Sequence, residues 1–153
     1  EEWCRAYARE FSIPLCVGRI FSFSDAHQPE FYFIPAMFKR VMRTPKSGTL
    51  EIFGVQGKRD FLRVPQICSC IADLYKKRYL GVVNIGTGVE NALSGIVSKI
   101  AIAMGREDIE LKIANDAPSF LVADSRRLES LGIKLENEID ILIHDMATHY
   151  KNP

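Results

Sequence analysis

The segment Gly54-Val55-Gln56-Gly57-Lys58-Arg59-Asp60-Phe61-Leu62-Arg63-Val64 joins a glycine turn to the start of a helix. Gly54 and Gly57 favour a tight turn, and the Arg-Asp-Phe sequence follows it almost directly. The guanidinium of Arg59 can bind a phosphate as a planar fork, with Asp60 fixing the turn or a neighbouring cation. Alternatively, Arg59 and Asp60 form a surface ion pair. The segment on its own favours neither hypothesis.

Helical and strand-like patterns alternate on both sides of this segment. Apolar side chains at helical spacing predict helices over residues 1–11, 34–42, 67–75, 93–104, 125–131 and 139–150. Short apolar or alternating runs predict strands over residues 15–21, 50–53, 82–85, 111–113 and 121–123. Pro35 suits a first helical turn, and Gly105 suits the position just after a helix. The alternation predicts one compact α/β unit over residues 1–153.

Charge and hydropathy argue against a nucleic-acid-binding protein and against a membrane protein. The 153 residues include 20 Lys and Arg against 19 Asp and Glu, a net charge of +1 at pH 7. Binding to nucleic acid or to a membrane surface needs a basic excess on one face, so neither partner is expected. No apolar run approaches the roughly 20 residues of a membrane span, and the opening residues do not form a signal peptide. We expect a cytoplasmic protein.

The first residues have the pattern of a helix already in progress. Trp3, Tyr7 and Phe11 recur every four residues, and no Ser, Thr, Asp or Asn cap precedes them. The chain also lacks an initiator Met. We therefore expect that it is part of a longer protein and begins within a helix.

The cysteines are expected to be reduced thiols. Their spacing includes Cys68-Ser69-Cys70, which is not a metal-knuckle spacing, and no second Cys/His pair completes a site. Free cysteine is usually buried and behaves as a small apolar side chain. We expect buried or semi-buried thiols at all four positions, Cys4, Cys16, Cys68 and Cys70.

The spacing of the histidines does not predict a metal site. His144 and His149 are five residues apart, about 140° around a helix, so they cannot share an ion as an i, i+4 pair can. His27 lies in the polar loop over residues 22–30, close to Asp25. It is either a solvated loop histidine or a substrate contact, and the solvated position is the ordinary one.

The Gly86-Thr87-Gly88 sequence follows a predicted strand and precedes a predicted helix. That arrangement is shared with dinucleotide-binding loops, and an acidic residue, Glu107 or Asp108, lies about twenty residues further on. Asn91, however, stands where the third glycine belongs, and the acid falls just after a helix instead of at a strand end. A tight strand-to-helix turn is the favoured interpretation.

Taken together, several segments resemble the C-terminal half of the extended short-chain dehydrogenase/reductases, the nucleotide-sugar epimerases, dehydratases and reductases. Each motif is short, and the specificity lies in their order and spacing over nearly the whole chain. The matching segments are Arg19-Ile20-Phe21, Phe33-Ile34-Pro35, Gly54 to Val64, Asn84-Ile85-Gly86-Thr87-Gly88, Ala123-Asp124 and Leu131-Gly132.

The resemblance implies an α/β fold made of the last strand of a Rossmann sheet and a small mixed α/β substrate-binding domain. Residues 1–153 would be the C-terminal, substrate-binding half of a homodimeric enzyme that acts on a nucleoside-diphosphate sugar with NAD or NADP. The family's cofactor loop and its catalytic Tyr-x-x-x-Lys would precede residue 1, so no catalytic residue is expected here. A non-catalytic, nucleotide-responsive binding or regulatory module on the same fold is the alternative.

The resemblance also assigns positions in the expected site. By this match, Phe21 lies near the nicotinamide end of the cofactor, and the substrate-binding positions are Ser22, Phe33, Ile34, Pro35 and Arg59. The sequence departs from the family pattern at three places. Ser24-Asp25 replaces a common Tyr-Gly, Gln66 replaces a frequent Asp, and Ala117-Pro118 replaces Arg-Pro, so a second cation is lost.

Overall fold

The computed structural model describes residues 1–114 and 117–152 and has the expected α/β class. The helices are α1 (Glu2–Glu10), α2 (Phe33–Arg43), α3 (Val64–Lys76), α4 (Leu93–Ala103), α5 (Arg126–Ser130) and α6 (Ile139–Lys151). The strands are β1 (Cys16–Ile20), β2 (Ser22–Ser24), β3 (Thr49–Ile52), β4 (Lys58–Arg59), β5 (Phe61–Arg63), β6 (Gly81–Ile85), β7 (Asn91–Ala92), β8 (Glu110–Ile113) and β9 (Phe120–Leu121).

The strands form several small sheets in which parallel pairing predominates. β1 pairs with β6, β2 with β5 and β3 with β8, all parallel, and the strand order β7-β4-β9 makes a mixed three-stranded sheet. Parallel strands need a long connection between them, and a helix lies within each of these three connections. The chain therefore brings one strand of the expected Rossmann sheet, β1, together with a parallel neighbour, β6.

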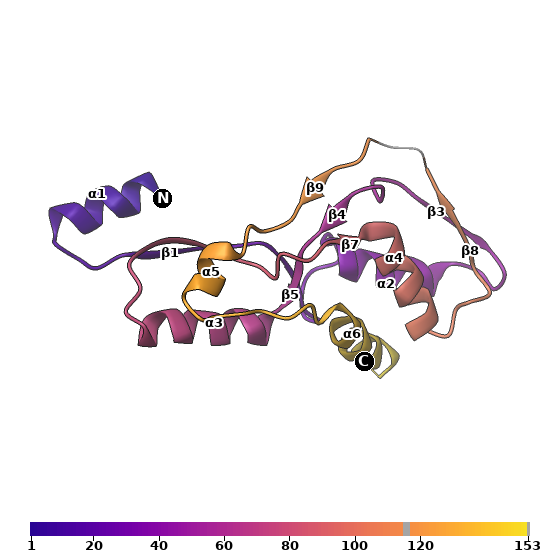
Figure 1. The fold of residues 1–153 in the computed structure, drawn as a ribbon. Coiled ribbons are helices and arrows are strands. Elements are labelled where there is room, and N and C mark those ends of the chain that lie inside the picture. Colours follow the sequence, from indigo (N-terminus) through magenta and orange to yellow (C-terminus); the bar gives the residue numbers. More distant parts are fainter. Residues whose placement is uncertain (115–116, 153) are drawn as a thin grey trace.

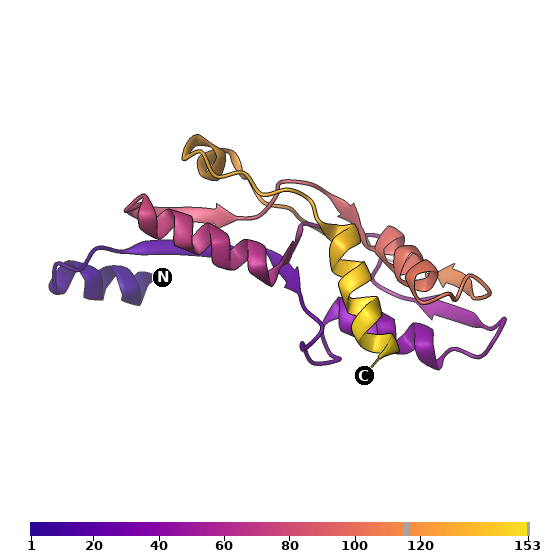
Figure 2. The same cartoon turned by 90° about the horizontal axis from the view of Figure 1, so that it is seen from below.

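Two hydrophobic clusters lie side by side along the chain, with α1 projecting at one end (Figure 1). The larger cluster is formed mainly by α2, β3, α4 and α6, and the smaller by α3, β6 and α5. Figure 2 shows α6 between α3 on one side and α4 on the other. β5 belongs to both clusters, because Phe61 packs in the larger and Leu62 in the smaller. Adjacent side chains of a strand point to opposite faces.

The inward stripe predicted for the last helix is confirmed. The apolar side chains whose spacing predicts a helix over residues 139–150 are buried along one side of α6, namely Ile139, Leu142, Ile143, Met146, Ala147 and Tyr150. The end of α4 is also as predicted. Gly105 has a φ of 67°, and the N–H groups of Gly105 and Arg106 donate to carbonyls of the last helical turn.

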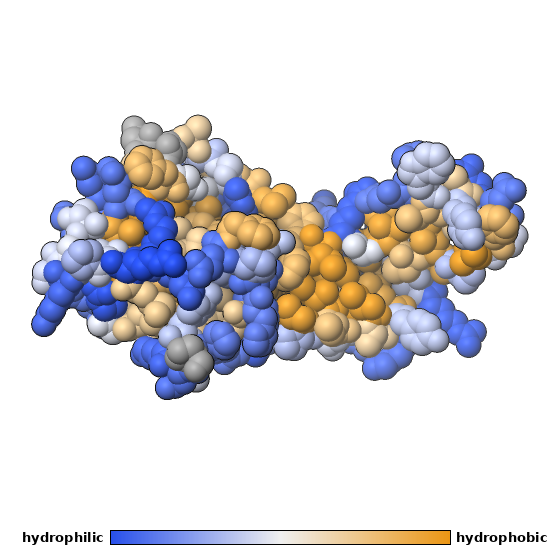
Figure 3. Space-filling view, turned by 180° about the vertical axis from the view of Figure 1, so that it is seen from behind, coloured by the Kyte–Doolittle hydropathy of each residue, from blue (hydrophilic) through white to orange (hydrophobic). Residues whose placement is uncertain are grey.

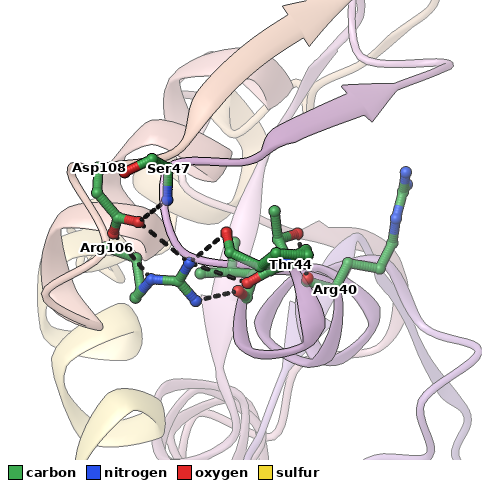
Figure 4. Close-up of polar contacts among 7 residues, drawn as sticks. Arg40, Thr44, Ser47, Arg106 and Asp108 are labelled. Carbon is green, nitrogen blue, oxygen red and sulfur yellow. Dashed lines mark hydrogen bonds and ion pairs between the residues drawn. The ribbon is translucent and has the colours of Figure 1, made fainter.

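Arg106 ties the C-terminal end of α2 to the segment that follows α4 (Figure 4). Its guanidinium donates to the carbonyl oxygens of Val41 at 3.0 Å and Thr44 at 2.9 Å. Its Nε donates to Asp108 at 2.9 Å, and the N–H of Ser47 donates to the same carboxylate at 2.6 Å. The Arg106 hydrogen bond, followed by that of Ser47, lowers the pKa of Asp108 to about 2. This cluster holds α2 against α4 in the larger hydrophobic cluster.

An apolar face covers β1 and the adjoining side of α3, and Figure 3 shows it as a broad orange area. α1 has no buried residue, and the side chain of Trp3 is 87% exposed. β1 is exposed at four of its five positions, although parallel strands are normally covered on both faces. On this face lie Cys16, Ile20, Ile71, Tyr75 and Leu80. No helix among the described residues is long and apolar enough to span a membrane.

Two sequence-based predictions need correction. The polar loop expected over residues 22–30 begins with a strand, β2, which is too short to show a period of its own and forms only because β5 lies beside it. The thiols are free, as expected, but only Cys70 is buried, and Cys4, Cys16 and Cys68 are exposed. Cys4 and Cys16 lie on α1 and β1, whose apolar sides are uncovered. Burial raises the pKa of the Cys70 thiol to about 11.

Candidate sugar-nucleotide pocket

A pocket of about 410 Å³ lies among β2, β5 and the beginning of α2. The residues that directly follow β1 form one wall of this pocket. Its other walls come from the first turn of α2, from β4–β5 and from the first residue of α4. The lining residues are Phe21, Ser22, Phe23, Ser24, Gln28, Tyr32, Phe33, Ile34, Gly54, Arg59, Phe61 and Leu93.

Five of the six positions that the resemblance assigns to ligands line this one pocket. They come from three separate stretches of sequence and are Phe21, Ser22, Phe33, Ile34 and Arg59. Pro35 is buried in the first turn of α2 and is not part of the lining. Its place at the start of a helix is as predicted, and its contact with a ligand stays a prediction.

Aromatic side chains give the pocket flat apolar walls. The rings of Phe33 and Phe61 are stacked, with centroids 6.4 Å apart and an interplanar angle of 25°. Phe23 and Tyr32 also face the space and are 40% and 44% exposed. Sequence reasoning did not assign Phe23, Tyr32 or Phe61 to the site. Phe23 and Tyr32 are each adjacent in sequence to an assigned residue, and Phe61 is adjacent to Asp60. This adjacency is the only signal in the sequence that could have indicated them.

Arg59 is the only charged side chain in the described lining. Its guanidinium donates from Nη1 to the carbonyl oxygens of Lys58 at 2.9 Å and of Ser119 at 2.8 Å. Nη2 donates to the hydroxyl oxygen of Ser119 at 2.8 Å. Arg59 forms no ion pair with any carboxylate of the described residues, 1–114 and 117–152. The pocket thus presents one fixed positive charge beside apolar walls, which suits an anionic group on a flat ligand.

The surface ion pair between Arg59 and Asp60 is not formed, and that hypothesis is wrong. Asp60 is completely buried. Its carboxylate accepts hydrogen bonds from the N–H and hydroxyl of Thr87, from Gly88 N–H at 2.8 Å and from Ala123 N–H at 3.3 Å. The expectation that Asp60 fixes the preceding glycine turn also needs correction, because the turn that its carboxylate holds is Gly86-Thr87-Gly88, in another part of the chain.

The contacts of Asp60 also explain Gly86-Thr87-Gly88. A dinucleotide-binding loop uses its backbone N–H groups to hold a pyrophosphate, but here those of Thr87 and Gly88 already donate to Asp60. A Cβ added at Gly86 would lie 2.3 Å from the Cβ of Ala123 and 2.7 Å from an oxygen of Asp60. Close packing is thus the reason for glycine at this position. The segment is a structural turn and does not fit a cofactor phosphate.

The loop after β2 is held by its own hydrogen bonds and by α6. The carboxylate of Asp25 accepts from the N–H of His27 at 2.9 Å, and the buried hydroxyl of Ser24 donates to the sulfur of Met146 at 3.7 Å. The ring of His27 lies edge-on to that of His149, with centroids 5.2 Å apart. His27 is exposed and is not part of the described pocket lining.

Two further concave regions belong to the exposed apolar face. One, of about 600 Å³, follows α1, and the other, of about 620 Å³, lies between β1 and α3. Both are lined almost entirely by apolar side chains. The pocket around Arg59, in contrast, has Ser22, Ser24 and Gln28 in its lining besides Arg59. Among the described residues, no cluster of three or more His, Cys, Asp or Glu side chains could hold a metal ion.

Comparison with solved structures identifies the fold. The chain superposes on the protein RMD from Pseudomonas aeruginosa, complexed with NADPH, with a TM-score of 0.84 and 18% identity, covering 98% of this chain and 52% of that one. The chain has the fold of about half of an extended short-chain dehydrogenase/reductase. The fold that the motif resemblance predicts is thereby confirmed, and the chain spans about half the length of these solved structures.

Other short-chain dehydrogenase/reductase structures agree. GDP-mannoheptose C4 reductase from Campylobacter jejuni, with NADP bound, gives a TM-score of 0.82 at 17% identity, covering 98% of this chain and 54% of that one. UDP-glucose 4-epimerase from Bifidobacterium longum, in complex with NAD+ and UDP, gives 0.76 at 21% identity, covering 99% and 52%. No family model matches the chain, and no curated protein matches it in sequence.

Proposed function

We propose that this chain is the C-terminal, substrate-binding half of an NAD(P)-dependent enzyme that epimerises, dehydrates or reduces a nucleoside-diphosphate sugar. The observation that carries the proposal is the pocket around Arg59. Five residues assigned to ligands by motif alone, from three separate segments, line this single space. The one charged side chain of the described lining is a cation, and aromatic rings form part of its walls. These properties suit a diphosphate joined to a base and a sugar.

The uncovered apolar face fits the same proposal. In the parallel β1–β6 pair, β1 is exposed at four of its five positions, which is unusual because parallel sheets are normally covered by helices on both faces. A preceding half of the protein would add parallel strands beside β1 and would cover α1 and α3. The cofactor, NAD or NADP, would be held mainly by that half. Of the residues in this chain, Phe21 fits the nicotinamide end, because it follows β1 directly and lies at the pocket wall.

The reacting groups would come from the preceding half. The described lining offers one guanidinium, an amide and hydroxyls that include the phenol of Tyr32, but no lysine, carboxylate or imidazole that could assist this phenol in moving a proton at a sugar carbon. This half would bind and orient the nucleotide and exclude water from it. A nucleotide-responsive regulator without turnover would use the same pocket, so turnover of the intact protein separates the two proposals.

The test uses the intact protein that contains this chain. Its melting temperature is measured with UDP-, GDP- and dTDP-sugars, each with NAD or NADP, followed by assays of turnover for the ligands that stabilise it. Stabilisation by at least one sugar nucleotide is expected, because a ligand that binds the native state raises its stability. If none of them raises the melting temperature, the proposal is wrong. The purified 153-residue chain should show no NAD(P)-dependent turnover in the same assay.

A further inference from the structure

Ser119 holds the end of the Arg59 side chain. It lies between β8 and β9, sixty residues beyond Arg59 in sequence. Its carbonyl oxygen accepts a hydrogen bond from Nη1 and its hydroxyl oxygen accepts one from Nη2, both at 2.8 Å. The two terminal nitrogens of the guanidinium are therefore fixed by one residue.

These contacts leave a particular pair of donors on Arg59. A guanidinium carries five N–H groups in one plane. The carbonyl oxygens of Lys58 and Ser119 take both N–H groups of Nη1, and the Ser119 hydroxyl takes one of Nη2. The Nε–H and the second Nη2–H remain on one edge, and no acceptor from the described part of the chain bonds to them. Two parallel N–H groups on one edge are the arrangement that binds a phosphate through two oxygens.

The close approach of Ser119 depends on Gly57. A Cβ added at Gly57 would lie 2.4 Å from the carbonyl oxygen of Ser119 and 2.9 Å from its hydroxyl oxygen. The N–H of Lys58 donates to the same carbonyl at 2.9 Å, and the β4–β9 pairing begins at the next residue, Phe120. The second glycine of the turn is thus required by the contact that orients Arg59.

We propose that Ser119 is a positioning residue, which directs the free edge of Arg59 toward the diphosphate of a nucleoside-diphosphate ligand. This inference rests on the proposed function and goes beyond it by assigning a role to a residue in the segment before β9. A long side chain loses rotamer freedom when it binds a ligand, and that cost falls when the side chain is already held in place. Ser119 therefore strengthens binding without contacting the ligand.

The experiment is a double-mutant cycle in the intact protein, with UDP, GDP and dTDP as probes in calorimetric titrations. Ser119→Ala should weaken binding about fivefold, which is less than the loss of a hydrogen bond to a charged group, because the backbone carbonyl of residue 119 still holds Nη1. Ser119→Thr keeps the hydroxyl and should restore the wild-type affinity. In an Arg59→Ala background, Ser119→Ala should cause no further loss. Ser98→Ala is the matched control, because within the described residues that hydroxyl bonds to Ser94 of its own helix and to no other residue.

The outcomes separate the two proposals. If Ser119→Ala weakens binding by the same factor with and without Arg59, its effect is structural and the positioning role is wrong. An unchanged affinity in Ser119→Ala likewise overturns the inference while leaving the proposed function in place. If wild type binds none of the three probes, or Arg59→Ala binds them as wild type does, the proposed function itself is wrong.

Discussion

The carboxylate of Asp60 accepts two hydrogen bonds from Thr87, one from its N–H at 3.1 Å and one from its hydroxyl at 2.7 Å. The other carboxylate oxygen accepts from the N–H groups of Gly88 and Ala123. One buried anion thus joins β4–β5, the turn after β6 and the segment after β9. Because Asp60 is completely buried, the donors that face it lose their acceptor inside the protein if the carboxylate is removed.

Asp60→Asn is expected to destabilise the protein by about 2–4 kcal/mol, because an amide turns one acceptor oxygen into a donor that faces other donors. The shift in the urea midpoint of the intact protein measures the loss. Asp73→Asn is the matched control, since Asp73 is exposed on α3 and its one ion pair within the described residues is with Lys76. It should change stability by less than about 0.5 kcal/mol. Equal effects of the two variants would show that the network is unimportant.

Arg59→Ala is expected to weaken nucleoside-diphosphate binding by roughly ten- to a hundredfold, because a charge-assisted fork is lost and no second cation lines the described pocket. Arg59→Lys should recover only part of the affinity, since an ammonium keeps the charge without the fork. Titration calorimetry on the intact protein gives both values.

The control for Arg59 is Arg63, four residues further along. Its guanidinium donates to Glu138 and Asp145, each at 2.8 Å, and it is not part of the described pocket lining. Arg63→Ala should therefore lower stability and leave affinity nearly unchanged. Wild-type affinity in Arg59→Ala together with weak binding in Arg63→Ala would mean that the match of residues 54–64 to the family pattern is wrong.

The contact between Arg106 and Asp108 predicts a loss of stability in acid. Hydrogen bonding lowers the pKa of Asp108 from an ordinary 3.8 to about 2, so the native state binds this proton less readily than the unfolded state. The stabilisation is complete above about pH 4 and is lost as the pH falls from about 4 to about 2. Urea titrations across that interval should show a shallower pH dependence for Asp108→Asn. An unchanged slope would refute the assignment.

The purified 153-residue chain is expected to self-associate, because its uncovered face is a large contiguous apolar surface. Light scattering should show a mass above that of the monomer. Ile71→Lys, on this face and 49% exposed, should reduce association. Ile141→Lys, on α6 and 47% exposed, is the matched control and should not. A clean monomer with a sharp two-state melt would contradict the prediction.

The long helices could be predicted because their apolar side chains recur at helical spacing along the one side that is buried. The stripe of α6 is an example. The strands predicted over residues 50–53 and 111–113 correspond to β3 and β8, but their parallel pairing could not be predicted from these patterns. The short strands β2 and β4 could not be predicted, since two or three residues show no period and these strands form only where a partner lies beside them.

Five residues of the pocket lining could be predicted from motif order, but their contacts could not. Motif order indicated Arg59, and the structure places it in the pocket lining. The partners of Arg59 and Asp60 come from much further along the chain, because Ser119 lies 60 residues beyond Arg59 and Thr87 lies 27 beyond Asp60. Local patterns carry no information on such contacts. For this reason the sequence left the ion pair open as an alternative.

β5 places Phe61 in the larger hydrophobic cluster and Leu62 in the smaller, with no residue between them. Melting of either cluster frees this strand and so withdraws a packed side chain from the other. The two clusters are therefore expected to lose protection against amide hydrogen exchange together, as one cooperative unit and not as separate foldons. The pocket, whose lining includes Phe61, is lost in the same event, so ligand bound there protects both clusters at once.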